Sequence, residues 1–380
     1  MKILAIETSC DETAIALISV CDKPVSDKGV KNRSTSLINS KLQFKILNNF
    51  VASQIKIHRP FGGVVPTLAK REHLKNLPFL FKKLISKNSV KSNFLCSIDL
   101  IAVTTGPGLE PCLWTGIKFA EELYHKIKKN NPKSKIIGVN HLKGHLYSFL
   151  LSKEILKYKK LKDIFPAVAL IVSGGHTILL LMKSLTEYKK LGETKDDAAG
   201  ESFDKVARML NLPYPGGPEL EKVAAKGNEK AVNFPRPMIN QKNYDFSFSG
   251  LKTAVFYHLR DNQKNITAGQ EFNISKLDSA INKADIAASF QQAVIDVLTA
   301  KTIKAAKEFK VKTILVSGGV AANKKLRLTL KKEAQKNNCA FIAPPLKFNM
   351  DNAVMIALAA YIANFKKEKI KISAKGDFPL

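Results

Sequence analysis

Two histidines four residues apart, His141 and His145 in the stretch VNHLKGHLYSF, are the first residues whose spacing indicates chemistry. On a helix, residues i and i+4 lie on one face, so both imidazoles would point the same way. A helix that supplies two metal ligands uses this spacing. The hydrolytic version of the motif has a glutamate directly after the first histidine, where this chain has Leu142. The pair predicts a metal site for chemistry without an adjacent general base; a plain pair of surface histidines is the alternative.

Five polar turns, four of them rich in glycine, are candidate phosphate-binding sites. Backbone N–H groups that no Cβ shields can approach a phosphate, and a helix that begins after the turn adds partial positive charge. The sequence contains neither a Walker loop nor a full G-x-G-x-x-G fingerprint, so we expect a nucleotide site of another type. Each turn taken alone could equally be a plain connection. The turns are TSCDET (8–13), TGPGLEP (105–111), SGGHT (173–177), PYPGGPELE (213–221) and SGGVAAN (317–323).

The elements that must position these turns are apolar runs typical of buried strands. Residues 2–20 predict a strand, a tight turn and a second strand, and residues 165–184 have the same pattern. The tetrapeptide VSGG occurs at 172–175 and again at 316–319. Alternating strand and helix patterns predict an α/β protein, and two halves that open alike predict a duplicated fold with an interdomain cleft. This is the plan of the actin-like fold (ASKHA, ribonuclease H-like).

The charge of the chain favours a polyanionic partner. Its 380 residues include 61 basic and 32 acidic side chains, which gives a net charge of +29. A surplus of this size is typical of proteins that bind nucleic acid. The alternative is a base-composition effect, because lysine far outnumbers arginine and specific phosphate recognition usually depends on arginine.

The cysteines and the hydropathy indicate the compartment. The five cysteines are scattered and form no C-x-x-C pair, which argues against a disulfide framework and against a cysteine-based zinc site. No apolar stretch approaches the ~20 residues of a membrane span, and the N-terminus does not resemble a signal peptide. We therefore expect a cytoplasmic protein with no membrane association.

A series of long motifs, in order from residue 1 to about residue 362, identifies a family. Together they resemble the TsaD family, the tRNA N6-adenosine threonylcarbamoyltransferases. The motifs are IETSCDET, FGGVVPTLAKREH, TTGPGL, VNHLKGHLYS, VSGGHT, DDAAGESFDKVARML, YPGGPELE, FSFSGLKTA, SFQQAVIDVL, VSGGVAANKKLR and NMDNAVMIA.

The resemblance implies an acyltransferase that moves the threonylcarbamoyl group from L-threonylcarbamoyladenylate to N6 of adenosine 37 in ANN-decoding tRNAs, with release of AMP. It implies one divalent metal ion per subunit, Fe²⁺ first and Zn²⁺ second, held by His141, His145 and Asp351. It also implies tRNA, TsaB-like and TsaE-like partners and an upstream TsaC-type adenylate synthase. The adenylate would lie against Ile171, Val172, Ser173, Gly174, Gly175, Asp204, Gly217, Glu221 and Asn323.

The resemblance also implies two actin-like subdomains. We expect the N-terminal subdomain at residues 1–137, completed by a C-terminal helix at about 352–370. The C-terminal subdomain at residues 138–351 would carry both the metal and the nucleotide site.

The chemistry of the residues agrees with such a transfer. A metal with two imidazoles and one carboxylate keeps open positions and can act as a Lewis acid on an oxygen of the adenylate. Asp11, in the first turn, is the candidate for orienting or deprotonating the adenine amine, which is a poor nucleophile. His73 and His176 are alternative metal ligands, and His176 is placed to shape the substrate pocket instead.

The chain departs from the family pattern at several places. Glu110, Pro111 and Cys112 follow the Gly-Pro-Gly loop, where Glu110 would be unfavourable near a phosphate although Pro111 suits a first helical turn. Thr67 stands where the family commonly has glutamate. The lysine-rich segments at 21–45 and 151–165 are longer than usual. Two rival functions remain: an actin-fold ATP-dependent kinase or ATPase, and a non-catalytic scaffold subunit.

Overall fold

The computed structural model divides into two compact units that are described separately below. The first unit consists of Met1–Phe165, Lys183–Glu187 and Ala343–Leu380, and the second of Pro166–Met182 and Tyr188–Ile342. Each unit is a five-stranded mixed sheet covered by helices, so the predicted α/β class is confirmed. The structure describes residues 1–23, 41–88, 94–262, 281–368 and 370–380.

The sheet of the first unit has the strand order β3-β2-β1-β4-β5. β1 pairs antiparallel with β2 and parallel with β4, β2 pairs antiparallel with β3, and β4 pairs parallel with β5. The middle of β1 is apolar and buried, because both faces of the sheet are covered. The strands are β1 (Lys2–Glu7), β2 (Glu12–Lys23), β3 (Lys41–Ser53), β4 (Leu100–Gly106) and β5 (Lys135–Asn140).

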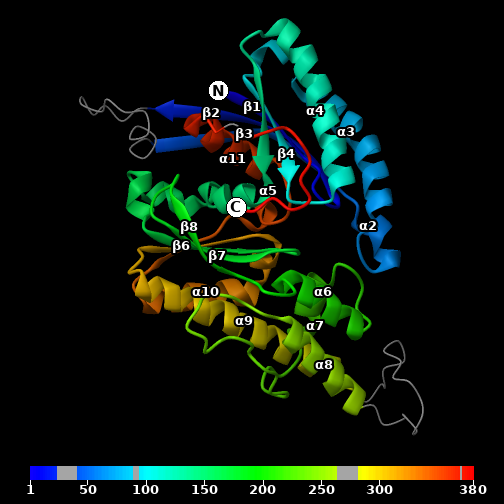
Figure 1. Cartoon of the computed structure of the whole chain (residues 1–380), viewed down its shortest axis with the longest axis vertical. Coiled ribbons are helices and arrows are strands. Elements are labelled where there is room, and N and C mark those ends of the chain that lie inside the picture. The colour runs from blue at the N-terminus through cyan, green and yellow to red at the C-terminus, as the bar shows by residue number, and fades with distance from the viewer. Residues whose placement is uncertain (24–40, 89–93, 263–280, 369) are drawn as a thin grey trace. The chain divides into compact units, whose positions relative to one another are not determined.

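Two pairs of helices cover this sheet (Figure 1). α3 (Pro66–Asn88) and α4 (Glu110–Asn130) pack on the face that carries Leu4 and Ile6, in one apolar cluster. α11 (Ala353–Lys366) packs against β1, β2, β4 and β5, and α5 (His141–Tyr147) packs against α11. The short helical segments of this unit are α2 (Ile55–His58), η1 (Arg59–Phe61), η2 (Leu95–Ser97), η3 (Ser148–Leu151), η4 (Lys153–Lys157), η5 (Leu161–Ile164) and η8 (Leu346–Phe348).

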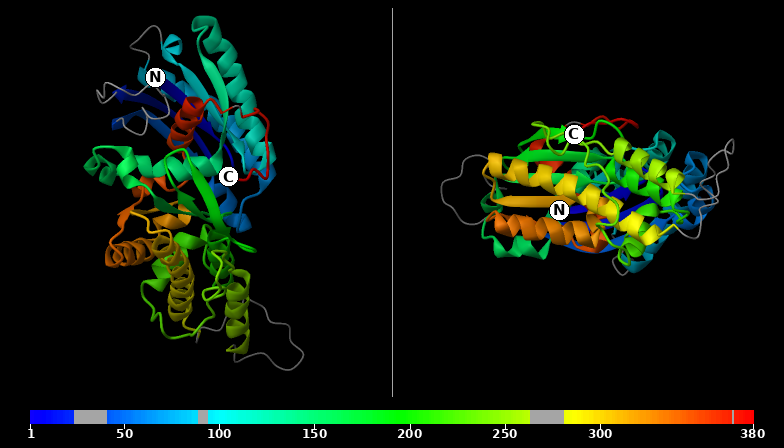
Figure 2. Two further views of the ribbon diagram at one scale, coloured as in Figure 1. Left: turned by 60° about the vertical axis from the view of Figure 1, so that its left-hand side comes forward. Right: turned by 90° about the horizontal axis from the view of Figure 1, so that it is seen from below.

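The sheet of the second unit has the order β10-β9-β6-β7-β8, with β7 antiparallel to β6 and β8 and with β9 parallel to β6 and β10. Helices α9 and α10 lie side by side in this unit (Figures 1 and 2). The strands are β6 (Ala167–Val172), β7 (Thr177–Met182), β8 (Tyr188–Glu193), β9 (Thr313–Ser317) and β10 (Ala340–Ile342). The helices are α6 (Ala199–Met209), α7 (Gly216–Ala224), α8 (Ser249–Asp261), α9 (Lys283–Glu308) and α10 (Lys324–Lys336), with the short η7 (Gly319–Ala322).

The two sheets have the same topology. In each, a strand–turn–strand hairpin (β1–β2 or β6–β7) continues into a further antiparallel strand on one side and into two parallel strands on the other. The predicted duplication is thereby confirmed, and it follows from the repeated pattern of residues 2–20 and 165–184.

The boundary between the units differs from the predicted one at residue 137. The first unit continues to Phe165 and includes the chain from Ala343 onward. The reason is that α5 follows β5 directly and packs on α11, which covers the first sheet. Both histidines and Asp351 therefore belong to the first unit, whereas we expected them in the C-terminal subdomain.

Both lysine-rich segments include regular structure among their described residues. Residues 24–40 of the segment 21–45 lie outside the described residues, and the parts on either side belong to strands β2 and β3. The segment 151–165 contains the short helical turns η4 and η5. None of the helices in the described part of the chain combines the length and the apolar character that a membrane span requires.

Candidate active site

The two histidines lie on one face of α5, as their spacing predicts. β5 ends at Asn140, whose side chain accepts a hydrogen bond from the Lys143 N–H at 3.2 Å, so the helix begins at His141. The two rings lie at 90° to each other with centroids 4.8 Å apart. His145 is fully buried and His141 nearly so, which rules out the alternative of a surface pair.

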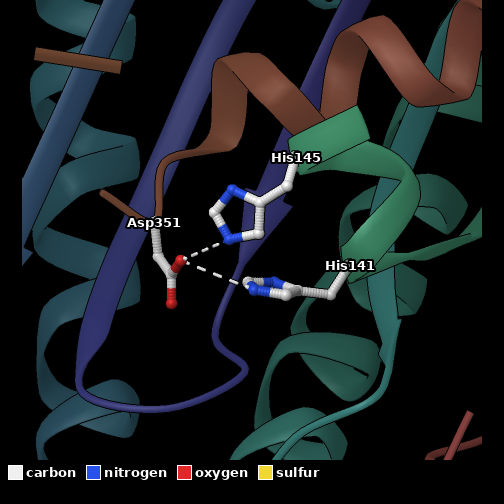
Figure 3. Close-up of side chains that lie close together, drawn as sticks. All are labelled: His141, His145 and Asp351. Carbon is white, nitrogen blue, oxygen red and sulfur yellow. Dashed lines mark ion pairs between the residues drawn. The ribbon is translucent and has the colours of Figure 1, made fainter. Parts of the chain in front are cut away.

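Asp351 joins the histidines from a distant part of the chain. Its Oδ1 lies 3.1 Å from Nε2 of His145 and 3.4 Å from Nε2 of His141 (Figure 3). The next residue, Asn352, caps α11 by accepting a hydrogen bond from the Met355 N–H at 3.1 Å. The cap makes α11 begin directly after Asp351, so the carboxylate extends from the start of that helix.

A glycine between the two histidines allows α5 to approach α11. A Cβ at Gly144 would lie 3.0 Å from the Cγ of Met355 and 3.1 Å from the Cδ1 of Ile356. These distances are shorter than ordinary van der Waals contacts, so a larger side chain would force Met355 and Ile356 to shift. Gly144 therefore leaves room for the close packing of the helix that carries the histidines on the helix that begins beside Asp351.

The donor set of this group fits a divalent metal ion. One ligand atom from each of His141, His145 and Asp351 lies within 4.8 Å of the others. Both ring nitrogens of His145 are buried, and Nδ1 makes no hydrogen bond within the described part of the chain. Nε2 lies beside the Asp351 carboxylate, so an ion between these two groups would be held by both. Two imidazoles and one carboxylate are a common ligand set for Fe²⁺ and Zn²⁺.

The electrostatics of the group also favour a cation. Burial by itself raises the pKa of Asp351, but the neighbouring His141 and hydrogen bonds from both histidines lower it well below its usual range. Burial lowers the pKa of His141, but the carboxylates of Asp351 and Glu7 outweigh burial and raise it well above its usual value. The buried carboxylate of Glu7 and the half-buried carboxylate of Asp351 thus stabilise positive charge at this position, and a metal ion would supply that charge without a proton on His141.

Glu7 is a member of this site that the sequence analysis missed. It ends β1 and is fully buried, and its Oε2 lies 3.1 Å from Nδ1 of His141. The signal was present in the sequence, because a glutamate that closes the apolar strand KILAIE is a charge at a buried position and needs a partner. The partner could not be named from the sequence, since His141 lies on a different element.

The turn between β1 and β2 places Asp11 in the same unit as the metal-binding group. The backbone oxygen of Asp11 accepts a hydrogen bond from the Gln54 N–H at 3.0 Å. His73 holds the preceding residue, because its Nε2 lies 2.9 Å from the backbone oxygen of Cys10, and its Nδ1 lies 2.8 Å from the Thr13 hydroxyl. His73 therefore positions the turn that carries Asp11.

The acidic residues of this turn affect one another. Burial raises the pKa of Glu12 well above its usual range, and the nearby charges of Asp11 and Asp351 raise it further.

Among the described residues, the group close enough to hold an ion contains neither His73 nor His176, which were the alternative ligands.

The Gly-Pro-Gly loop after β4 packs on the first turn of the chain. The Leu109 N–H donates to the backbone oxygen of Ser9 at 2.8 Å, and a Cβ at Gly108 would lie 2.5 Å from that oxygen. The Glu110 carboxylate has a partner in the same unit: its Oε1 accepts a hydrogen bond from the Gly376 N–H at 3.2 Å. Pro111 lies in the first turn of α4, as predicted. The unusual Glu110 is therefore a contact for the C-terminal segment.

The two VSGG turns meet at one edge of the second sheet. β6 and β9 are parallel neighbours, so the turns that follow them lie side by side. Gly318 has φ +95°, and a Cβ there would lie 2.3 Å from the backbone oxygen of Val172. In contrast, no atom lies within 4 Å of the Cβ positions of Gly174 and Gly175. The backbone of the first turn is thus accessible for a ligand. The second turn packs against the residue that precedes the first turn.

The remaining predicted substrate residues hold helix N-termini of the same unit. Asp204 Oδ1 accepts hydrogen bonds from the N–H groups of Gly216 and Gly217, at 2.7 and 3.3 Å, where α7 begins. Glu221 Oε1 accepts one from the Lys324 N–H at 2.8 Å, where α10 begins. The Asn323 side chain caps α10 through the Leu326 N–H at 2.9 Å.

All nine predicted substrate residues belong to the second unit, but they differ in what they can offer a ligand. Ile171 and Val172 are fully buried strand residues, so their side chains are unavailable and only their backbones remain. Gly200 N–H donates to the Ser173 oxygen at 3.2 Å, which joins the first VSGG turn to the start of α6. Asp204 lies one turn further along that helix.

Comparisons with known proteins identify the family of the chain. Residues 45–358 match the family described as TsaD: tRNA N6-adenosine threonylcarbamoyltransferase. A tRNA N6-adenosine threonylcarbamoyltransferase of Thermosipho africanus (strain TCF52B) is 46% identical over 362 residues, which are 95% of this chain and 94% of that protein. One from Moorella thermoacetica is 42% identical over 382 aligned positions, which cover 100% of this chain and 97% of that protein.

The fold has a counterpart among solved structures. Full-length HypF in its phosphate- and nucleotide-bound form matches with a TM-score of 0.55 at 12% identity, covering 98% of this chain and 47% of that chain. At this identity the likeness concerns the fold alone, and it confirms the predicted actin-like α/β fold. By the length and identity of the matches to its relatives, the chain belongs to the TsaD family, the tRNA N6-adenosine threonylcarbamoyltransferases.

Proposed function

We propose that this chain transfers the threonylcarbamoyl group of L-threonylcarbamoyladenylate to N6 of adenosine 37 in ANN-decoding tRNAs. The observation that carries the proposal is the group of two buried histidines, His141 and His145, and the half-buried Asp351 in a member of this family. The N6 amine attacks the carbonyl carbon of the threonylcarbamoyl group, and the bond from that carbon to the phosphate oxygen breaks. AMP leaves with the bonding electrons, and the amine loses one proton.

The group of two histidines and one aspartate would hold one divalent ion. We propose Fe²⁺ as the resident ion and Zn²⁺ as the alternative, because both accept this ligand set. When bound, the ion would act as a Lewis acid toward an oxygen of the adenylate. The reaction needs no metal-bound hydroxide, which agrees with Leu142 in place of the glutamate of hydrolytic sites.

Asp11 is the residue that we propose to take the proton from N6 as the amine attacks. A carboxylate within hydrogen-bond reach of a weakly nucleophilic amine accelerates such a step. The position of Asp11 supports this role, because the turn that carries it is held by contacts from Gln54 and His73. A fixed turn keeps the carboxylate in place without reorganisation during the reaction.

The adenylate would bind to the second unit through the first VSGG turn and the starts of α7 and α10. Open space around Gly174 and Gly175 supports binding through backbone N–H groups. Partial positive charge at a helix N-terminus supports binding of the phosphate. Asp204 and Glu221 are carboxylates beside these helix starts and suit ribose or threonyl hydroxyls.

The partners follow from the family and from the charge. A net charge of +29 supports binding of tRNA. We also propose TsaB-like and TsaE-like partner proteins and a TsaC-type enzyme that supplies the adenylate, all of them in the cytoplasm.

The test is transfer itself. The purified chain, supplied with Fe²⁺ or Zn²⁺, receives fresh threonylcarbamoyl-adenylate and an ANN-decoding tRNA transcript with adenosine at position 37, with and without TsaB-like and TsaE-like proteins. The digested tRNA is analysed by mass for the modified nucleoside. Product that is absent with the His141→Ala/His145→Ala variant supports the proposal. No product from a folded, metal-loaded chain under any partner condition favours the scaffold function, and ATP turnover without tRNA favours the kinase or ATPase.

A further inference from the structure

The carboxylate of Glu7 receives three hydrogen-bond donors inside the first unit. The Ser9 N–H donates to Oε1 at 2.6 Å, and the Thr104 hydroxyl donates to Oε2 at 2.6 Å. Nδ1 of His141 lies 3.1 Å from the same Oε2. A fully buried carboxylate is costly, and these contacts leave it no freedom to rotate. Such an arrangement requires an explanation beyond packing.

We propose that Glu7 is a positioning residue for the metal site. Its carboxylate accepts the N–H of His141 Nδ1 and thereby leaves the lone pair of Nε2 free for a divalent ion. The inference rests on the metal site proposed above, but it does not depend on which group is transferred.

The geometry identifies which nitrogen faces the ion. A neutral imidazole carries a hydrogen on one ring nitrogen and a lone pair on the other. Nε2 of His141 lies 3.4 Å from Asp351 Oδ1, on the side of the other two ligands, and Nδ1 lies beside Glu7. An ionised carboxylate can only accept, so the hydrogen must be on Nδ1 when Nε2 binds metal. Metal-binding histidines commonly bond a carboxylate in this way.

Ser9 cannot perform this function in place of Glu7. Its hydroxyl lies 3.2 Å from Nδ1 of His141, so it also contacts the ring. A hydroxyl can donate or accept, and it therefore tolerates either position of the imidazole hydrogen. The ionised carboxylate of Glu7 tolerates only one. The selectivity for the metal-binding form of the ring must come from Glu7.

A comparison with His145, the other histidine of the group, shows that the contact with Glu7 is specific to His141. Nδ1 of His145 makes no hydrogen bond to any described residue, and that ring is held by packing and by the contact of its Nε2 with Asp351. The two histidines thus differ at Nδ1, which contacts the Glu7 carboxylate in His141 and makes no such contact in His145. Loss of Glu7 should loosen His141 while it leaves His145 in place.

The substitution Glu7→Gln tests this relationship because all three neighbours of the carboxylate are donors. If the amide oxygen takes the place of Oε2, the amide NH₂ faces the Ser9 N–H, which cannot turn away. If the NH₂ takes that place, it faces His141 Nδ1, and the ring must move its hydrogen to Nε2. Either arrangement penalises the metal-binding form, although the side chain has nearly the same volume.

Three further variants separate the partners of Glu7. Thr104→Val removes the hydroxyl that holds Oε2, and Thr104→Ser restores it. Ser9→Ala removes the hydroxyl near His141 but keeps the N–H that holds Oε1. Thr302→Val is the matched control: Thr302 is also fully buried, and its hydroxyl bonds the Leu298 oxygen at 2.7 Å in the second unit.

The experiment measures the affinity of the full chain for Zn²⁺ and Co²⁺ by competition with a chromophoric chelator, and the absorption spectrum of the Co²⁺ form. We expect Glu7→Gln to weaken binding about 10–100-fold and to alter the Co²⁺ spectrum. Thr104→Val should weaken binding less, and Thr104→Ser, Ser9→Ala and Thr302→Val should bind as the wild type does.

The outcomes distinguish the inference from the proposed site. A wild-type chain that binds neither ion contradicts the metal site itself. A wild type that binds, together with a folded Glu7→Gln variant of equal affinity and unchanged spectrum, overturns the role of Glu7. If Glu7→Gln does not fold, the pair Thr104→Val and Thr104→Ser decides: equal affinity in both overturns the inference. A loss in Ser9→Ala as large as in Glu7→Gln also overturns it.

Discussion

Nε2 of His145 lies 3.1 Å from Oδ1 of Asp351, although the two residues come from distant parts of the chain. The contact forms because α5 packs on α11, which begins directly after Asp351. His145 is fully buried, whereas the Asp351 side chain is half-buried. A cation between these atoms would be held by both, because an imidazole nitrogen and a carboxylate oxygen are both metal ligands.

Metal binding should therefore stabilise the folded chain. At a free Zn²⁺ concentration of about 100 times the Kd, we expect the free energy of unfolding to rise by about 2.7 kcal/mol, because the ion binds only the folded site. His145→Ala should abolish this gain. Thermal denaturation with and without Zn²⁺ measures it, with His125→Ala, an exposed histidine on α4, as the control. An equal gain in His145→Ala would place the ion elsewhere.

Gly144→Ala should separate α5 from α11. Its Cβ would lie 3.0 Å from Met355 and 3.1 Å from Ile356, and overpacking of this kind typically costs about 1–3 kcal/mol. We expect both a lower melting temperature and a weaker affinity for Zn²⁺. Gly250→Ala is the matched control: its Cβ would have 3.9 Å of space to Pro237, and alanine favours a helix over glycine. The prediction fails if Gly144→Ala is as stable as the wild type and binds Zn²⁺ equally.

Asp196 should make the second unit sensitive to acid. Burial raises the pKa of Asp196, but hydrogen bonds from Ser247, Ser249 and the Phe248 N–H outweigh burial and lower it. Its stabilising contribution is therefore complete above the unfolded-state pKa of about 3.9 and is lost as pH falls through the lower folded-state pKa. Because it accepts the N–H groups at the start of α8, Asp196→Ala should cost about 0.5–2 kcal/mol at neutral pH.

Urea denaturation of the wild type and Asp196→Ala at several pH values between about 7 and 3 measures this effect. The difference in unfolding free energy should be largest at neutral pH and should shrink in acid. Ser247→Ala, which removes one hydroxyl but leaves both backbone contacts, should have a smaller effect. A difference that stays constant with pH would show that the charge of Asp196 contributes nothing.

Removal of residues 374–380 should loosen the Gly-Pro-Gly loop. The Gly108 N–H donates to the Gly376 oxygen at 3.1 Å, and the Lys375 N–H donates to the Thr105 oxygen at 2.8 Å. Asn140, the cap of α5, also donates to the Phe378 oxygen at 2.8 Å. We expect faster hydrogen exchange at the Gly108 amide and at the start of α5, because these groups lose their partners.

The matched variant for the truncation is Glu110→Ala, which removes only the side-chain contact with the Gly376 N–H. It should leave the exchange of the Gly108 amide nearly unchanged, since the backbone contact remains. Equal protection of Gly108 in the wild type and in the truncated chain would mean that the C-terminal segment does not hold the loop.

Local patterns in the sequence determined much of this protein. The i, i+4 spacing placed His141 and His145 on one helix face, because the helical period is 3.6 residues. Alternating strand and helix patterns predicted the α/β class, two halves that open with the same strand–turn–strand pattern predicted the duplication, and Pro111 indicated the first turn of α4. Each of these features depends on residues that are neighbours in the chain. The resemblance to a family added Asp351, which no local pattern connects with the histidines.

Only the tertiary structure decided which distant residues meet. It paired Glu7 with His141 and Glu110 with Gly376, and it assigned the metal-binding group to the first unit. It also showed that Asp196 caps α8, whereas the Thr177 hydroxyl accepts the first N–H of α6, the helix that follows Asp196 in the sequence. The physical reason is that such contacts depend on the register of strands and the packing of helices, and these are set by the whole core.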